Sequence, residues 1–130
     1  MRFFATSMIG ATALFATVGA ASAQDAAAGE NVFKKCHVCH NIGEGAKNMV
    51  GPELNGVVGR KAGTLEGYNF SDANKNSGLT WDEATLTIYL KNPKAEVPGT
   101  KMSFPGLTNE DDIKNVIAFL KQFGPDGKKM

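Results

Sequence analysis

The chain has 130 residues, with 14 lysines and arginines against 13 aspartates and glutamates, and its formal net charge is +1. This length is typical of one small domain. The near-zero net charge does not imply the strong electrostatic attraction on which nucleic-acid and anionic-membrane binding depend. We therefore expect no nucleic acid among its partners.

The first 23 residues are predicted to form a secretory signal peptide. Arg2 provides a positive start, an apolar run follows over residues 3–21, and residues 21–23 (ASA) match the small-residue cleavage pattern. A retained membrane anchor is the alternative, but threonine, serine and glycine interrupt the run. We expect cleavage after Ala23 and one folded domain over residues 24–130 that is not membrane-embedded.

A first helix is predicted from the alanines after Asp25 to about Lys35. Asp25 is a good N-cap residue, because its carboxylate can accept a hydrogen bond from a free backbone N–H of the first turn. Gly29 is unfavourable inside a helix, so we expect another helix to cross closely at that position.

The segment Cys36-His37-Val38-Cys39-His40 contains every cysteine and histidine of the chain. Two cysteines three positions apart, with a histidine directly after the second, form the attachment signature of a c-type haem. On a helical turn, Cys36, Cys39 and His40 share one face. We therefore predict one covalently attached haem c, held by thioethers from both cysteines, with His40 as an axial ligand of the iron.

Three alternatives compete for these cysteines. A thioredoxin-like Cys-x-x-Cys is expected beside a βαβ pattern, which this chain lacks. A structural zinc site needs four Cys or His ligands, and here the four such residues crowd into five positions. A disulfide would leave His40 unexplained.

The rest of the chain predicts two more helices and no strand. Residues 41–67 are rich in glycine and irregular, as expected of a chain draped over a flat cofactor, and residues 71–76 are predicted to form one short helical turn. Thr80 and Glu83 form a predicted capping box for a helix that Pro93 ends. Thr108 is the predicted N-cap of the last helix, whose apolar stripe consists of Ile113, Val116, Ile117 and Leu120.

Met102 is the predicted second iron ligand. His37 is too close to His40 in sequence to reach the opposite face of the haem, and a neutral thioether is a suitable soft ligand. Met49 follows His40 by only nine residues, whereas Met102 follows a Pro-Gly turn 62 residues after His40. Core packing is the alternative role for an isolated methionine.

In these motifs the sequence resembles the class I cytochromes c, especially the bacterial cytochrome c2 branch. Beyond the haem motif, the resemblance rests on segments 51–60 (GPELNGVVGR), 72–78 (DANKNSG), 92–94 (NPK) and 98–102 (PGTKM). It covers nearly all of the chain after residue 23. It implies an all-α, small cytochrome c fold, with three main helices and long loops wrapped around one covalently bound haem.

The resemblance also implies roles by position. The carbonyl of Pro52 would accept a hydrogen bond from the His40 ring, Tyr89 and Thr100 would flank Met102, and Phe104 would close the haem edge. The residues expected around the haem propionates are Arg60, Asn74 and Trp81. Gly29 and Phe33 would pack against Phe119. For the aromatic residues, plain core packing is the alternative.

Phe70 departs from the pattern of mitochondrial relatives, which usually have at this position a tyrosine that bonds a propionate. Tyr68 matches another tyrosine of the family and would partly substitute. We hypothesise a less satisfied propionate environment in this protein.

Ligation by His and Met, general in cytochromes c, saturates the iron and favours the reduced state. The predicted function is therefore a one-electron carrier and not an enzyme, placed in the periplasm by the export signal. One rival is a five-coordinate c-type haem enzyme or gas sensor, although no third histidine exists to act as a distal base. A thiol oxidoreductase that uses Cys36 and Cys39 is the other.

Charge placement predicts where partners bind. Lysines flank the haem motif and the Met102 loop (Lys34, Lys35, Lys47, Lys94 and Lys101), whereas acidic residues gather at helix starts. A neutral total can hide a positive face that steers acidic redox partners, although an ordinary solvated surface is the alternative. Candidate partners are a bc1-type complex, an oxidase, a photosynthetic reaction centre or a periplasmic dehydrogenase, and we expect a monomer.

Overall fold

The computed structural model describes residues 10, 11, 13 and 25–130. The predicted cleavage site after Ala23 and nearly all of the predicted signal peptide therefore lie outside the described residues. Among the residues that are described, no helix is long and apolar enough to cross a membrane.

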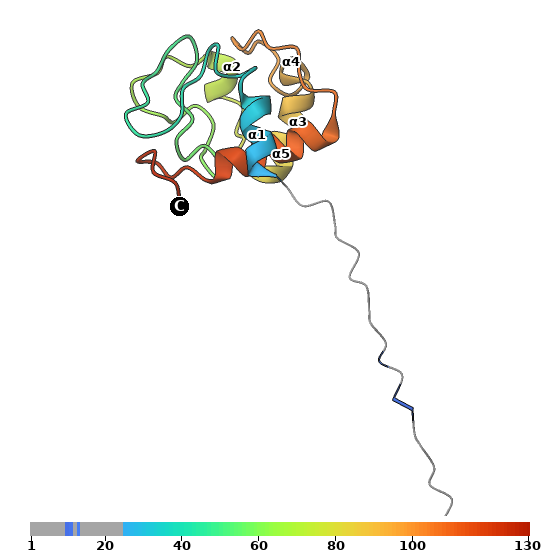
Figure 1. The fold of residues 1–130 in the computed structure, drawn as a ribbon. Coiled ribbons are helices and arrows are strands. Elements are labelled where there is room, and N and C mark those ends of the chain that lie inside the picture. The colour runs from blue at the N-terminus through green and yellow to red at the C-terminus, as the bar shows by residue number, and fades with distance from the viewer. Residues whose placement is uncertain (1–9, 12, 14–24) are drawn as a thin grey trace, which may run out of the picture.

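Five helices form the regular structure of residues 25–130: α1 (Ala26–Phe33), α2 (Asp72–Lys75), α3 (Glu83–Lys91), α4 (Pro93–Glu96) and α5 (Glu110–Lys121). This part of the chain has no strand, and its two isolated bridges join Lys61 to Thr80 and Phe123 to Lys129. The all-α fold is confirmed, with α1, α3 and α5 as the three main helices (Figure 1).

The start of α1 agrees with its predicted N-cap. The carboxylate of Asp25 accepts a hydrogen bond from the N–H of Ala28 at 3.1 Å. The α-helix ends at Phe33, two residues before the predicted end at Lys35, and the chain continues in turns into the cysteine motif.

Two predicted N-caps are wrong. Asp82, and not Thr80, caps α3 by accepting from the N–H of Thr85 at 2.7 Å, and Thr80 instead forms a bridge with Lys61 before the helix. Asn109, and not Thr108, caps α5. Its side-chain oxygen accepts hydrogen bonds from the N–H groups of Asp111 and Asp112 at 2.8 and 3.2 Å. Asparagine is the stronger N-cap residue of these two.

The sequence pattern does not predict α4, since it indicates only that Pro93 ends the preceding helix. Proline disrupts a helix interior, but at the first helical position its missing N–H has no partner to lose and its fixed φ suits the helix. The side chain of Asn92 caps the new helix by accepting from the N–H of Ala95 at 3.3 Å. One proline therefore ends one helix and begins the next.

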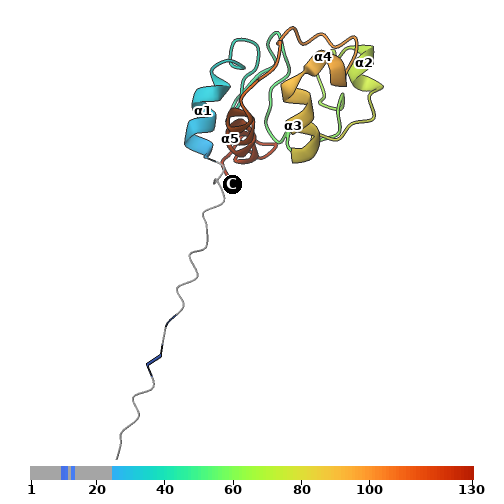
Figure 2. The same cartoon turned by 90° about the vertical axis from the view of Figure 1, so that its right-hand side faces the viewer.

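Helices α1 and α5 cross in direct contact (Figure 1 and Figure 2). A Cβ atom on Gly29 would overlap the backbone carbonyl of Asn115 in α5, so only glycine permits this approach. The rings of Phe33 and Phe119 pack with centroids 5.1 Å apart. The close helix crossing predicted at Gly29 is confirmed.

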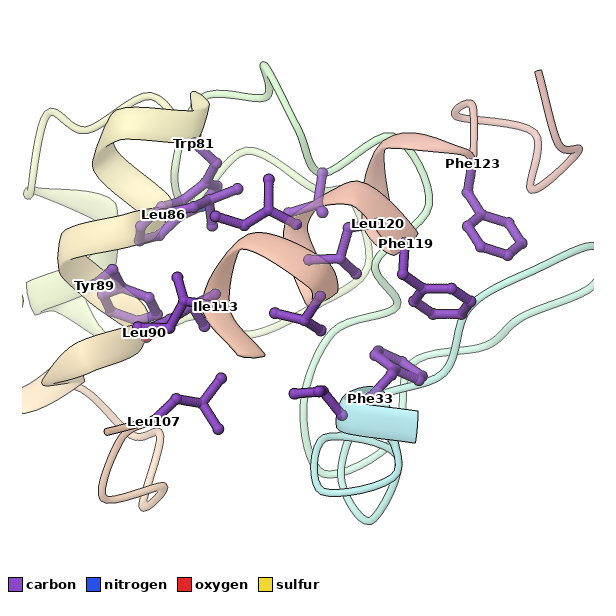
Figure 3. Close-up of a cluster of buried hydrophobic side chains, with 14 of the residues drawn as sticks. Phe33, Trp81, Leu86, Tyr89, Leu90, Leu107, Ile113, Phe119, Leu120 and Phe123 are labelled. Atoms are coloured by element: carbon purple, nitrogen blue, oxygen red, sulfur yellow. The ribbon is translucent and has the colours of Figure 1, made fainter. Parts of the chain in front are cut away.

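The hydrophobic core runs from this crossing to α3 (Figure 3). Ile113, Val116 and Ile117 of α5 are each 1% exposed, and full burial of such a side chain stabilises the fold by about 1.5–3 kcal/mol. On the α3 side, the rings of Trp81 and Tyr89 pack with centroids 4.6 Å apart. The loops lie over this packed core.

The loop between the cysteine motif and α2 has a defined course without helix or strand. Asn55, only 7% exposed, uses its side-chain amide to exchange two hydrogen bonds with the backbone of Gly43, both 2.8 Å long. This arrangement satisfies the amide as a backbone pair would. The irregular loop expected over residues 41–67 is confirmed, and side chains hold it in place.

Candidate haem site

The loops and the helical core enclose a cavity of about 590 Å³, within the range typical of small-molecule and cofactor sites. Every residue predicted for the site lines it: Cys36, Cys39, His40, Pro52, Arg60, Tyr68, Asn74, Trp81, Tyr89, Thr100, Met102 and Phe104. The tertiary structure thus brings residues from separate segments of the chain to one place.

The cysteine motif lies on helical turns that continue from α1. The N–H of Cys36 donates to the carbonyl of Phe33 at 2.8 Å, and the N–H of His40 donates to the carbonyl of Cys36 at 2.9 Å. Neither cysteine is part of a disulfide, and both line the cavity together with His40. His37 lies outside the lining, as its place on the other side of the turn predicts.

The environment of Cys36 does not suit thiol–disulfide exchange. Burial raises the pKa of its thiol to about 11, so the thiol is protonated at neutral pH. Exchange requires a thiolate, and catalytic cysteines have a lowered pKa. Within residues 25–130, no group of three or more His, Cys, Asp or Glu side chains lies close enough together to hold a metal ion.

His40 is oriented by the segment that follows it. Its Nδ1 lies 2.7 Å from the carbonyl oxygen of Pro52, which can only accept, so Nδ1 carries the proton and Nε2 keeps a free lone pair. Burial lowers the pKa of His40, which favours the neutral imidazole that a metal requires. A Cβ atom on Gly51 would lie 2.5 Å from the imidazole Cε1, so the backbone passes directly beside the ring.

Met102 lies on the same cavity in the loop between α4 and α5. The hydroxyl of Tyr89 donates to the Met102 sulfur at 3.2 Å, and the N–H of Met102 donates to the hydroxyl oxygen of Thr100 at 3.2 Å. Burial raises the pKa of Tyr89, so its hydroxyl remains a donor at neutral pH. These bonds fix the thioether of Met102 at the cavity wall.

Polar groups in the cavity fit an anionic edge of a haem. Among the described residues, Asn74 Oδ1 is a buried side-chain atom without a hydrogen-bond partner, which is costly unless a bound group satisfies it. Arg60 donates to the carbonyls of Asn55 and Glu53 at 3.1 and 3.5 Å. Burial lowers the pKa of Arg60, but a guanidinium stays charged at neutral pH and can face a carboxylate.

The two aromatic residues near this polar edge are placed differently from each other. Phe70 is 9% exposed and packs edge-on against Tyr68, with centroids 4.8 Å apart. The Tyr68 hydroxyl donates to the carbonyl of Val50 at 2.7 Å, so its proton is already engaged. Because a propionate carboxylate can only accept, the Tyr68 hydroxyl in this arrangement has no free proton with which to substitute for the missing tyrosine.

The sequence patterns do not identify the apolar lining. Val38 and Val50, 75% and 76% exposed, lie at the cavity and reach the surface, and Leu54 and Val57 also line it. A single apolar residue in a loop carries no periodicity, so nothing in the spacing marks these positions. They surround the predicted ligands with the apolar surface that a porphyrin needs.

Comparison with known proteins agrees with this site. The family model described as cytochrome c matches residues 26–124. The chain belongs to the cytochrome c family. It is 56% identical over 122 residues to a cytochrome c2 of Blastochloris viridis, and the aligned region covers 94% of this chain and 96% of that protein.

Two further relatives support the assignment. A cytochrome c2 of Rhodoblastus acidophilus is 63% identical over 107 residues, covering 82% of this chain and all of that protein. The solved structure of cytochrome cH from Methylobacterium extorquens has a TM-score of 0.71 and 55% identity, covering 75% of this chain and 98% of that one. The cytochrome c therefore carries one covalently attached haem c, and its role is electron transport.

Proposed function

We propose that this cytochrome c is a periplasmic one-electron carrier in which His40 and Met102 are the two axial ligands of the haem iron. The observation that carries the proposal is that both side chains, 62 residues apart in sequence, line one cavity together with Cys36 and Cys39. In this assignment the two cysteines attach the haem, and the remaining predicted residues form its surroundings.

The side chains around the cavity suit electron transfer rather than the conversion of a substrate. When bound, the haem supplies a one-electron couple at its iron. His40 and Met102 would occupy both axial positions, which leaves no place for a substrate, as is general in cytochromes c. Trp81 and Tyr89, both 7% exposed, keep water from the cavity wall, and Arg60 and Asn74 would hold the carboxylates of the haem.

Substitution of Met102 tests the ligand assignment. In the ferrous holoprotein, Met102→Ala is expected to open an axial position and allow rapid binding of carbon monoxide, which the unmodified protein should resist. Met49→Ala is the matched control, because Met49 is 48% exposed and does not line the cavity. Equally rapid binding by the unmodified protein would support the rival five-coordinate enzyme or gas sensor.

A pyridine haemochrome assay tests the other rival. Covalent attachment through both cysteines predicts a c-type spectrum that survives acid–acetone extraction. Absence of covalent haem would favour a thiol oxidoreductase, although the raised pKa of Cys36 makes that thiol a poor nucleophile.

The cavity mouth is the proposed contact surface for redox partners. Val38 and Val50 are exposed there, and Lys35 and Lys101 also line the cavity. Lys101 is held in place, since its ammonium donates to the carbonyl of Asn69 at 2.7 Å. An apolar centre with lysines beside it suits small, transient contacts with an acidic partner, as electron carriers require.

Ionic strength tests this surface. Reduction rates by an acidic partner, such as a bc1-type complex or a periplasmic dehydrogenase, are expected to fall as salt rises, because salt screens exposed charges. Lys101→Gln should weaken that dependence on salt. Lys129→Gln is the control and should not weaken it, because Lys129 packs over Phe123 and does not line the cavity. Rates insensitive to salt would contradict a steering role.

Export is the remaining part of the proposal. Residues 1–23 would be removed after Ala23, and covalent haem attachment and an export signal together favour the periplasm. Mass spectrometry of the protein purified from a periplasmic fraction should give a chain that begins at Gln24. A membrane-bound product that retains residues 1–23 would contradict it.

A further inference from the structure

One peptide group beside the axial histidine is hydrogen-bonded at both ends. The carbonyl oxygen of Pro52 accepts from Nδ1 of His40 at 2.7 Å. The N–H of Glu53, which belongs to the same peptide group, donates to the side-chain oxygen of Asn48 at 2.9 Å. A chain of two hydrogen bonds therefore runs from the exposed Asn48 side chain to the imidazole.

This peptide group can transmit polarisation between its two partners. Its C=O and N–H belong to one conjugated system, and hydrogen bonds in series strengthen one another. Asn48 must present its amide oxygen to the N–H of Glu53, because the NH₂ group can only donate. An acceptor at this N–H raises the negative charge on the Pro52 oxygen and strengthens the bond that this oxygen accepts from His40.

Other contacts keep the peptide in place without Asn48. The N–H of Gly51 donates to the carbonyl of Cys39 at 2.8 Å, and the N–H of Leu54 donates to the carbonyl of Asn41 at 2.9 Å. The peptide between Pro52 and Glu53 is thus tied on one side to Cys39 and on the other to Asn41, the residue that follows the cysteine motif. Loss of the Asn48 side chain should remove the polarising bond and leave the loop folded.

We propose that Asn48 is a positioning residue that acts through the peptide between Pro52 and Glu53 to set the electron density on His40. This inference deepens the proposed function and rests on it, since it requires His40 to bind the haem iron. A stronger acceptor on Nδ1–H makes an imidazole a more basic ligand, and a more basic ligand favours ferric over ferrous iron. Asn48 therefore lowers the reduction potential of the protein.

Two substitutions should shift the potential in opposite directions. Asn48→Ala removes the acceptor, so the midpoint potential of the holoprotein in a spectroelectrochemical titration is expected to rise. Asn48→Asp offers a charged and stronger acceptor, so the potential is expected to fall. Lys47→Gln is the control for charge, because it makes the same change of one charge unit at the neighbouring position, and its shift should be smaller than that of Asn48→Asp.

A second measurement examines the hydrogen bond itself. In Asn48→Ala, the amide hydrogen of Glu53 is expected to exchange faster, and the paramagnetically shifted His40 ring resonances should move while Met102 stays bound. If the potential and the His40 resonances match the unmodified protein in both Asn48 variants, with both axial ligands retained, the inference alone is overturned. An unmodified protein whose iron is not bound by His40 overturns the proposed function and the inference together.

Discussion

The two halves of this cytochrome c are held together by different means. In the helical half, α1, α3 and α5 bury apolar side chains against one another, and only part of this core, such as Leu86, Leu90 and Leu120, also faces the cavity. In the loop half, residues 41–71 and the Met102 loop border a cavity of about 590 Å³. There, side-chain bonds such as those of Asn55 to Gly43 hold the backbone.

This difference indicates which half depends on the haem. Core side chains away from the cavity, such as Ile113, keep their contacts when the haem is absent, whereas apolar residues around the cavity, including Leu86 and Leu120 of the helices, have no partner on one side. Because a domain of this size buries little apolar surface in total, the cavity lining is a large share of its stability. The predictions below test this contrast, from the largest expected effect to the smallest.

Removal of the haem should have the largest effect. The double substitution Cys36→Ala/Cys39→Ala, prepared without haem, is expected to lose most of its helical circular dichroism, because the loop half and the cavity-facing side chains of α3 and α5 lose the group that they pack against, and a bound group stabilises the native state. The unmodified holoprotein under the same conditions is the reference. Near-native helicity in the haem-free variant would show that the helical half folds alone.

The next largest effect should come from adding a methyl group, which should cost more folding stability in the helical half than in the loop half. Gly29→Ala forces a Cβ into the backbone of Asn115, and such overpacking costs about 1–3 kcal/mol or more. Gly45→Ala is the matched loop substitution, with a φ of +74° and no heavy atom within 4 Å, and its cost should be limited to backbone strain of about 1–2 kcal/mol. Urea unfolding of both holoproteins measures this, and a larger loss for Gly45→Ala would contradict the contrast.

The loss of folding stability at acidic pH should depend in part on Asp82, the N-cap of α3. The N–H of Thr85 donates to the Asp82 carboxylate at 2.7 Å and lowers the pKa of Asp82. Because the folded pKa is below the unfolded value, this contribution is fully present above about pH 4 and is lost as the pH falls through the folded pKa. Asp82→Asn keeps a capping oxygen without titrating.

Thermal melts between neutral and acidic pH can check this prediction. The melting temperature of the unmodified protein is expected to exceed that of Asp82→Asn near neutral pH, and the gap should close in acid. A gap that stays the same at every pH would show that the carboxylate charge makes no difference at this helix start.

Phe70→Tyr should have the smallest effect and concerns the polar edge of the cavity. Phe70 is buried against Tyr68, whose own proton is bonded to Val50. A new hydroxyl that reaches a propionate should raise stability by about 1 kcal/mol and shift the reduction potential. If Phe70→Tyr leaves both unfolding and potential unchanged, the hypothesis of a less satisfied propionate environment is wrong.

Much of the site can be predicted from sequence because its strongest signals are local. Cys36, Cys39 and His40 lie within one helical turn, so their convergence follows from helical geometry alone. The unfavourable Gly29 predicts a close crossing, which its contact with Asn115 confirms. The N-caps of α3 and α5 are less predictable, because neighbouring polar residues compete, and Thr80 instead forms a bridge with Lys61.

By itself, the sequence determines the haem attachment motif, the three main helices and the choice of Met102 over Met49 as the candidate ligand. Covalent chemistry and helical periodicity are properties of near neighbours, and chain length limits which residues can span a cofactor. Only the tertiary structure decides that Val38 and Val50 border the cavity and that Asn48 reaches the peptide behind His40. These contacts depend on the path of an irregular loop, which packing and side-chain hydrogen bonds set and no repeating pattern encodes.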